Sequence, residues 1–270
     1  MSSPVLFDAP GPKTRRRSLL VSLIALAAIL AGLIWIVLIL AAPRQSSGLT
    51  LPGFFAPSRW DIFKDPVVWN FIGIGVVNTL RAAGVAMILA LAVGLLFASL
   101  RTSHHRVIRI PAVLIQEFLR GMPVLLMMLF ILLAASTGAF WAVVLALGLY
   151  NGAIIGEILR AGLVALPRGQ REAGLSLGLT RGQTKTFVEL PQAFRQMLPV
   201  IVAQLVVLLK DTSLGYIVGY NELIRTTMTS LNAFYGNRYL FSLFIVTLVI
   251  YLGINLCLSA FARRLAKRRN

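Results

Sequence analysis

The sequence predicts an all-α, polytopic membrane protein with about six transmembrane helices. Hydrophobic residues make up 58% of its 270 positions and charged residues only 13%, whereas a soluble domain carries about 25% charged residues. Several apolar runs approach or exceed the roughly 20 residues that a helix needs to cross the hydrocarbon core of a bilayer. Basic residues are concentrated in alternate segments between these runs. Composition, run length and charge placement therefore agree on a chain that lies mostly within a membrane.

Five apolar runs satisfy the requirements of a membrane span, and a sixth does so more weakly. The weakest is short because Lys210 and Asp211 interrupt an apolar stretch that resumes afterwards. Another is short but continues a helix that starts near Pro111. In chain order, the predicted spans are 19–42, 82–100, 121–135, 139–156, 197–209 and 239–261.

The placement of charge predicts the orientation of these spans. The formal net charge is +17, which by itself also fits a nucleic-acid-binding protein. With the N-terminus inside, however, 18 of the 26 basic residues fall in inside segments and five in outside segments. This bias follows the positive-inside rule. It predicts that both termini are cytoplasmic and that the basic residues reflect topology rather than a nucleic-acid partner.

The chain divides into a membrane core and shorter flanking segments. The first span is longer than the 7–15 apolar residues of a typical signal core, which favours an uncleaved anchor. A single cysteine, Cys257, lies within the last span, so a disulfide framework is not expected. The predicted segments are a disordered cytoplasmic tail (1–18), an anchor (19–42), an irregular Pro-rich external linker (43–70), the core (75–262) and a basic tail (263–270).

A hydrophilic segment between two spans carries the most specific motif. Its spacing resembles the E-A-A-x3-G-x9-I-x-L-P signature of permeases in ATP-binding cassette importers, with Gly in place of the third residue and Val in place of Ile. The resemblance implies the type I ABC importer permease fold and a coupling loop at about 166–195 that docks on a separate ATPase. The residues that carry the motif are Glu172, Ala173, Gly174, Gly178, Val188, Leu190 and Pro191.

The local sequence predicts two short helices within this 166–195 loop. Residues 169–177 favour a helix with Glu172 in its first turns, near the positive end of the helix dipole. Gly178 is placed to end that helix in the left-handed conformation. The sequence from Thr180 to Gln183 fits a capping box that starts a second helix. That helix is expected to end near Leu190, because Pro191 disfavours α geometry in the residue before it. The competing interpretation is an ordinary amphipathic loop.

Charged residues inside membrane segments are the other functional candidates, because each costs about 2.5–3.5 kcal/mol at a helix centre. Glu117 and Arg120 lie three residues apart on one helix face, where they are able to pair. Gly121 and Pro123 follow them and favour a break in the helix. For each candidate the alternative is an interfacial side chain or a structural ion pair. The candidates are Arg81, Glu117, Arg120, Glu157, Lys210 and Asp211.

Five further blocks lie within 75–262, at residues 78–80, 117–123, 169–170, 190–193 and 210–214. They resemble blocks in permeases of importers for polar amino acids. There the corresponding blocks read N-T-L, F-R-G-T-P, G-Q, L-P-Q-A and K-[DN]-[TS]-S-L, and the last adds Thr212 and Ser213 to the pathway candidates. Met122 replaces the usual Thr of the second block. Segments 150–152, 211–216 and 6–12 look most like the glutamate-uptake permeases. The resemblance thus implies an acidic substrate, glutamate first, with glutamine or another polar amino acid as the alternative.

The resemblance also implies partners. These are ABC ATPase subunits, a second permease subunit (a similar chain or a second copy), an extracytoplasmic amino-acid-binding protein and the lipids of a prokaryotic plasma membrane. No P-loop motif occurs, so the chain itself is not expected to hydrolyse ATP or carry a cofactor, and the ATPase would bind ATP and Mg²⁺. Adjacent His104 and His105 lack neighbouring ligands for a metal site.

Two other classes of protein remain open from the residues alone. A secondary transporter or channel would use Glu157 or Asp211 as an ion site, but it leaves the hydrophilic motif without a role. A membrane-embedded enzyme would need a clustered acid–base pair or a motif such as G-x-S-x-G, and the sequence offers neither.

Overall fold

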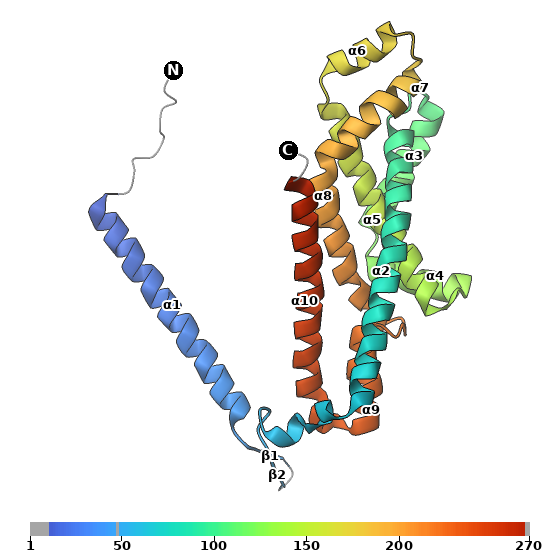
Figure 1. Cartoon of the computed structure of the whole chain (residues 1–270). Coiled ribbons are helices and arrows are strands. Elements are labelled where there is room, and N and C mark those ends of the chain that lie inside the picture. Colours follow the sequence, from blue (N-terminus) through green and yellow to red (C-terminus); the bar gives the residue numbers. More distant parts are fainter. Residues whose placement is uncertain (1–10, 47–48, 268–270) are drawn as a thin grey trace. The chain divides into compact units, whose positions relative to one another are not determined.

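The computed structural model describes residues 11–46 and 49–267 and divides into two units after Ile62 (Figure 1). In the first unit, helix α1 (Pro12–Ala41) buries none of its side chains. Its long uncharged apolar stretch is suited to lipid. An antiparallel pair, β1 (Arg44–Ser46) and β2 (Leu49–Leu51), follows it, and then the 3₁₀ turn η1 (Pro57–Arg59).

In the second unit, which begins within η2 (Asp61–Lys64), the regular elements among the described residues are all helices. Five helical segments of the chain are long and apolar enough to cross a membrane, and a bent pair raises the number to six. The all-helical class and the expected number of spans are thus confirmed. The elements are α2 (Pro66–Arg101), α3 (Arg106–Gly121), α4 (Val124–Ala135), α5 (Gly138–Ala165), α6 (Arg168–Ser176), α7 (Arg181–Gln183), η3 (Thr184–Glu189), α8 (Leu190–Asp211), η4 (Thr212–Tyr216), η5 (Arg225–Leu231), α9 (Asn232–Tyr235), η6 (Asn237–Tyr239) and α10 (Leu240–Lys267).

The bent pair is α3 and α4, whose axes turn by 103° (Figure 1). Helix α3 ends at Gly121, and Met122 is extended with φ −82° and ψ 131°. Proline forces such a conformation on the residue before it, because its ring clashes with an α-helical neighbour. The break that the sequence predicts near Gly121 and Pro123 is therefore present.

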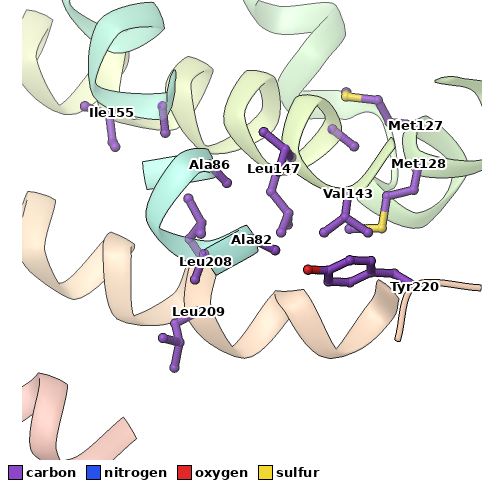
Figure 2. Packing of buried hydrophobic residues seen from close by; sticks show 14 of the residues in the cluster. Ala82, Ala86, Met127, Met128, Val143, Leu147, Ile155, Leu208, Leu209 and Tyr220 are labelled. Carbon is purple, nitrogen blue, oxygen red and sulfur yellow. The ribbon is translucent and has the colours of Figure 1, made fainter. Parts of the chain in front are cut away.

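The core forms where α2 packs along α5, and α4 and α8 cover the same cluster. Figure 2 shows Ala82 and Ala86 of α2 beside Leu147 of α5, with Met128 of α4 and Leu208 of α8 around them. Small side chains on α2 let the two helix backbones approach closely, which is how helices associate where lipid removes the hydrophobic driving force.

Glycines on α5 extend this close approach along the helix. A Cβ atom at Gly148 would lie 2.4 Å from Leu89, and one at Gly152 would lie 2.6 Å from Val93. These glycines recur every four residues on one face, so they form a groove that receives the larger side chains of α2. The α2–α5 pair is consequently the closely packed centre against which α4 and α8 pack.

The structure corrects the expected ends of three segments. Helix α2 begins at Pro66, inside the linker expected to be irregular to residue 70, because Asp65 accepts a hydrogen bond from Val67 N and proline suits the first helical position. Of the expected disordered tail 1–18, residues 1–10 lie outside the described residues, whereas those from Pro12 on are helical. Helix α10 continues through the expected basic tail as far as Lys267.

A second correction concerns Pro191. The helix before it was expected to end near Leu190, but Leu190 is α-helical (φ −64°, ψ −44°) and the chain continues directly into α8. The segment before the proline is the π-helix η3, in which Leu190 N bonds Lys185 O. A π turn is wider than an α turn, and this is where the proline ring would otherwise clash. The loop therefore joins one short helix to a long one.

Candidate functional site

The 166–195 loop lies at the end of the second unit that also holds the last turns of α2 and α10; we name this the α6 end (Figure 1). Gly178 follows α6 with φ +82° and confirms the predicted left-handed cap. Thr180 and Gln183 form the predicted capping box, with Thr180 N donating to Gln183 Oε1 at 2.8 Å. Helix α6 starts at Arg168 and has no acidic residue in its first turn, so Glu172 lies further from the positive dipole end than expected.

Two hydrogen bonds tie this loop to the α2 side of the bundle, and a third joins its two ends. Lys185 Nζ of η3 donates to Ser99 O of α2 at 2.7 Å. Arg171 Nη2 of α6 lies 3.0 Å from His104 Nε2 in the α2–α3 connection. A third bond, 3.0 Å long, joins the side-chain amides of residues 192 in α8 and 170 in α6. Side chains of α6 and η3 therefore contact α2, the α2–α3 connection and the first turn of α8.

The outer surface of the loop exposes large apolar side chains. Leu177 is 83% exposed and Phe187 is 70% exposed, in a loop that also carries many charged and polar residues. Glu172 and Ala173 are also exposed. Apolar residues that a polar segment leaves uncovered indicate a surface for a protein partner. The exposed motif residues and these apolar side chains belong to the same short segment.

The packing around Gly174 explains why the chain has glycine where the signature has alanine. This glycine is buried against η3, and a Cβ atom here would lie 2.5 Å from Thr184 Cγ2. Alanine at position 174 thus needs either a smaller residue at 184 or a shift of α6. The glycine reflects the packing of α6 on η3.

We expect Gly174→Ala to weaken this packing by about 1–3 kcal/mol, the usual cost of overpacking. Thr184→Ala removes the atom that clashes and should restore the double variant, since Thr184 Oγ1 has no hydrogen-bond partner among the described residues. Thermal unfolding of the purified protein measures both. Equal loss of stability in the single and double variants would contradict this packing argument.

The intramembrane candidates separate into three places. The first is an ion-pair cluster, in which Arg101 of α2 bonds Glu117 of α3 at 3.2 Å and Glu157 of α5 at 2.8 Å. Arg120 pairs with Glu117 at 3.3 Å, as the i,i+3 spacing predicts, and Arg160 pairs with Glu157 at 2.7 Å. Arg101 is largely buried and ends α2, so it joins three helices near the α6 end.

The second place is a cavity of about 430 Å³ between α8, η5 and α10. Lys210 and Ser213 line it together with Tyr251 and Asn255 of α10. Asn255 Oδ1 is buried without a hydrogen-bond partner among the described residues. Buried polar atoms are nearly always satisfied, so an orphaned acceptor in a cavity wall points to a ligand or water there.

The remaining candidates lie beside this cavity or apart from it. Thr212 is buried and its hydroxyl donates to Leu209 O at 2.6 Å, with Tyr251 Oη 3.5 Å away. Asp211 ends α8 and is partly buried. Arg81 forms the third place, where its guanidinium carbon stacks 5.1 Å from the ring centroid of Phe140. Arg81 is therefore held by a cation–π contact.

Glu222 and the central role of Arg101 emerge only from the structure. Glu222 is fully buried between the candidate spans that end at Tyr216 and begin at Asn237. Its carboxylate accepts hydrogen bonds from Ile224 N at 2.8 Å and Arg225 N at 2.7 Å, and it lies 3.3 Å from Tyr251 Oη. An acidic residue directly before a helix start is a recognised capping signal, but its burial follows only from the packing of α10.

Glu222 makes the local stability of segment 221–231 dependent on pH. Burial disfavours the charged form and raises the pKa of Glu222 from 4.5 to about 7; the groups that face it are Tyr251 and Arg225. The folded segment thus binds the proton more tightly than the unfolded one. Its stabilisation is complete below about pH 4.5 and is lost as pH rises through 7.

We expect amide hydrogen exchange in 221–231, corrected for the intrinsic rate, to be about tenfold faster at pH 8 than at pH 6. Glu222→Gln removes the titrating group and should abolish this difference while keeping a side chain of similar size. An unchanged pH dependence in the variant would assign the effect to another group.

Other features carry no site. No group of three or more His, Cys, Asp or Glu residues able to hold a metal occurs within the described parts of the chain. His104 contacts Arg171, as described above, and Cys257 is an exposed free thiol on α10.

Comparison with known proteins identifies the family to which this chain is similar. A family model described as "Binding-protein-dependent transport system inner membrane component" matches residues 90–270. The glutamate transport system permease protein GluD of Corynebacterium glutamicum is 38% identical over 220 residues, which cover 78% of this chain and 80% of GluD. The probable glutamine ABC transporter permease protein GlnP of Bacillus subtilis is 34% identical over 204 residues, covering 74% of this chain and 94% of GlnP.

Solved structures have the same fold. A crystal structure of an amino acid ABC transporter with histidines matches with a TM-score of 0.68 and 27% identity, over 79% of this chain and all of the other. An inward-facing structure of the methionine transporter MetNI matches with a TM-score of 0.63 over 76% of this chain and 99% of the other, at 18% identity, which is a likeness of fold alone.

Proposed function

The chain belongs to the inner-membrane components of binding-protein-dependent transport systems, as a permease of a polar amino-acid ABC importer, and on that premise we propose that it carries acidic amino acids, glutamate first. It is a multi-pass, non-catalytic membrane subunit without a cofactor of its own, and ATP is bound by the ATPase partner. The observation that carries the substrate proposal is that the exposed Lys210 and the orphaned Asn255 acceptor line the same 430 Å³ cavity.

The chemistry of that cavity suits an acidic amino acid. The Lys210 ammonium complements a carboxylate, and a charge-assisted hydrogen bond is about twice as strong as a neutral one. Asn255 Oδ1 is an acceptor for the substrate ammonium, and Ser213 adds a hydroxyl. The similarity to GluD agrees with this assignment.

Glutamine is the second candidate substrate. Lys210 lies in a block that the wider subfamily shares, and a neutral side-chain amide would find partners in Ser213 and Asn255. The similarity to GlnP supports this alternative. In either case the α-carboxylate supplies one negative group for Lys210.

The 166–195 loop couples ATP hydrolysis by the partner ATPase to transport by this chain. Its exposed Leu177 and Phe187 dock on the ATPase, together with the motif residues from Glu172 to Pro191. Closure of the ATPase dimer displaces α6, and the bonds to Ser99 and to α8 carry this displacement into the bundle. The permease pair then changes from inward- to outward-facing as a rigid-body transition.

This mechanism requires an orientation and a set of partners. The α6 end and both termini face the cytoplasm, in agreement with the excess of basic residues in these segments. A binding protein delivers the substrate from the opposite side. A second permease subunit, either a similar chain or another copy, completes the pathway.

The substrate is tested by uptake of labelled glutamate in cells with and without the gene, challenged by unlabelled aspartate, glutamine and arginine. We expect the deletion to lose high-affinity glutamate uptake, and aspartate to compete best. Unchanged glutamate uptake together with lost glutamine uptake would select the second candidate. Restoring the gene on a plasmid controls for effects on neighbouring genes.

The energy source is tested separately in proteoliposomes. The chain alone should neither hydrolyse ATP nor accumulate substrate, and transport should appear when the ATPase and binding protein are added. Accumulation by the lone chain under an ion gradient would instead identify a secondary transporter.

A further inference from the structure

A further cavity lies at the α6 end, next to the loop that carries the motif. Its volume is about 710 Å³, and its walls come from the end of α2, the α2–α3 connection, the end of α5, α6 and η3. It is separate from the 430 Å³ cavity, with which it shares no lining residue. Neither the motif nor the proposed substrate pathway accounts for it.

The walls of this cavity are strongly basic. Arg168, Arg171, Arg181 and Lys185 line it, and Glu189 is the one acidic residue among the lining residues. None of the four cations forms an ion pair within 4.0 Å in the part of the chain that the structure describes, whereas Arg101, Arg120 and Arg160 all do. Four cations and one carboxylate give the walls of this cavity a net charge of +3.

Two of these cations are held in place, and two are free to engage a ligand. Lys185 Nζ bonds Ser99 O, and Arg171 contacts His104, which also lines the cavity. Arg168 and Arg181 make no side-chain hydrogen bond within the described residues. Guanidinium groups present a planar fork of donors that matches the oxygens of a phosphate group.

One wall of the cavity is apolar. Leu163 and Val164 of α5 line it, and Val164 is 70% exposed. A basic pocket between helices on the cytoplasmic side of a membrane is suited to the headgroup of an anionic phospholipid. An exposed apolar wall beside it suits the start of an acyl chain, which a soluble phosphate compound would leave uncovered.

We propose that this cavity binds a phosphate-bearing anion, and that the headgroup of an anionic phospholipid is the source that its mixed basic and apolar walls favour. Bound there, the anion neutralises the cations that connect α6, η3 and the end of α2. The lipid thereby stiffens the attachment of the 166–195 loop to the bundle. This role goes beyond substrate choice and requires no change in the proposed pathway.

The test uses the purified permease–ATPase complex in native mass spectrometry, titrated with phosphatidylglycerol or with phosphatidylcholine. We expect the wild type to retain phosphatidylglycerol preferentially, and Arg168→Gln/Arg181→Gln to weaken this retention on the order of tenfold, since each basic residue near an anionic surface contributes measurably. Arg106→Gln/Arg109→Gln is the matched control, because it removes the same charge at exposed positions outside the cavity. The control should bind the lipid as the wild type does.

The remaining outcomes distinguish the sources of the anion. If inorganic phosphate stabilises the wild type but not the cavity variant, and phosphatidylglycerol shows no preference, the anion is a soluble phosphate. Equal retention of phosphatidylglycerol by the cavity variant and the wild type, without a phosphate effect, would overturn the proposal. Loss of ATPase co-purification in the cavity variant with lipid retention unchanged would also overturn it, and would assign the cations to the ATPase contact.

Discussion

Substitution of Gly178 by valine is expected to abolish uptake while the chain still inserts into the membrane. Gly178 has φ +82°, a left-handed conformation that costs other residues about 1–2 kcal/mol, and β-branched side chains tolerate it least. The valine would redirect the chain between α6 and Thr180, so that the exposed Glu172 of α6 is displaced relative to the exposed Phe187 of η3. Uptake assays and co-purification of the ATPase with the tagged permease measure the two effects.

A matched control comes from the same loop. Gly169 lies in α6 without a positive φ, and a Cβ atom there would meet nothing within 4 Å. Gly169→Val should therefore preserve uptake. Glu172→Lys tests the surface without altering the backbone, because it reverses an exposed charge on α6. Normal assembly and uptake in both Gly178→Val and Glu172→Lys would disprove the docking role of the loop.

Substitution of Lys210 by glutamine is expected to raise the KM for glutamate by about 10- to 100-fold. Lys210 is the cationic residue lining the 430 Å³ cavity, and a hydrogen bond to a charged group contributes about 1.5–3 kcal/mol. Glutamine keeps a polar side chain but removes the charge, so binding is affected more than folding. Initial rates of uptake over a range of glutamate concentrations give KM and the maximal rate separately.

Two controls separate substrate contact from a structural role. Lys210→Arg keeps the charge and should retain most of the affinity. Assembly with the ATPase should be the same in all three proteins. If the glutamine variant transports glutamate with an unchanged KM, Lys210 does not contact the substrate, and Asp211 or Arg81 becomes the next residue to test.

Local sequence was sufficient wherever a feature depends on neighbouring residues alone. The spans are long apolar runs, and the positive φ of Gly178 and the capping box from Thr180 to Gln183 are set within one or two turns. The ion pair of Glu117 with Arg120 is likewise an i,i+3 contact. The spacing of the loop motif identified the permease family, and the match over residues 90–270 confirmed it.

Other features depend on residues far apart in the chain. The clash of a residue larger than glycine at position 174 arises only because Thr184 packs against it. Arg101 joins Glu117 and Glu157 because α2, α3 and α5 converge, although in the sequence it is one more basic residue in a short connection. Continuity through Pro191 required the π turn of η3, which no local rule for proline anticipates.

By itself, then, the sequence determined the membrane class, the approximate spans and the motif that identifies the family, because hydropathy, charge bias and spacing are properties of the chain in order. Only the tertiary structure decided which charges share a site. It separated Lys210 from the Arg101 cluster, placed Asn255 and Lys210 in the wall of one cavity, and buried Glu222 against Tyr251. The reason is physical: burial and pairing depend on which helix faces meet, and small residues on α2 and α5 settle that by allowing close approach.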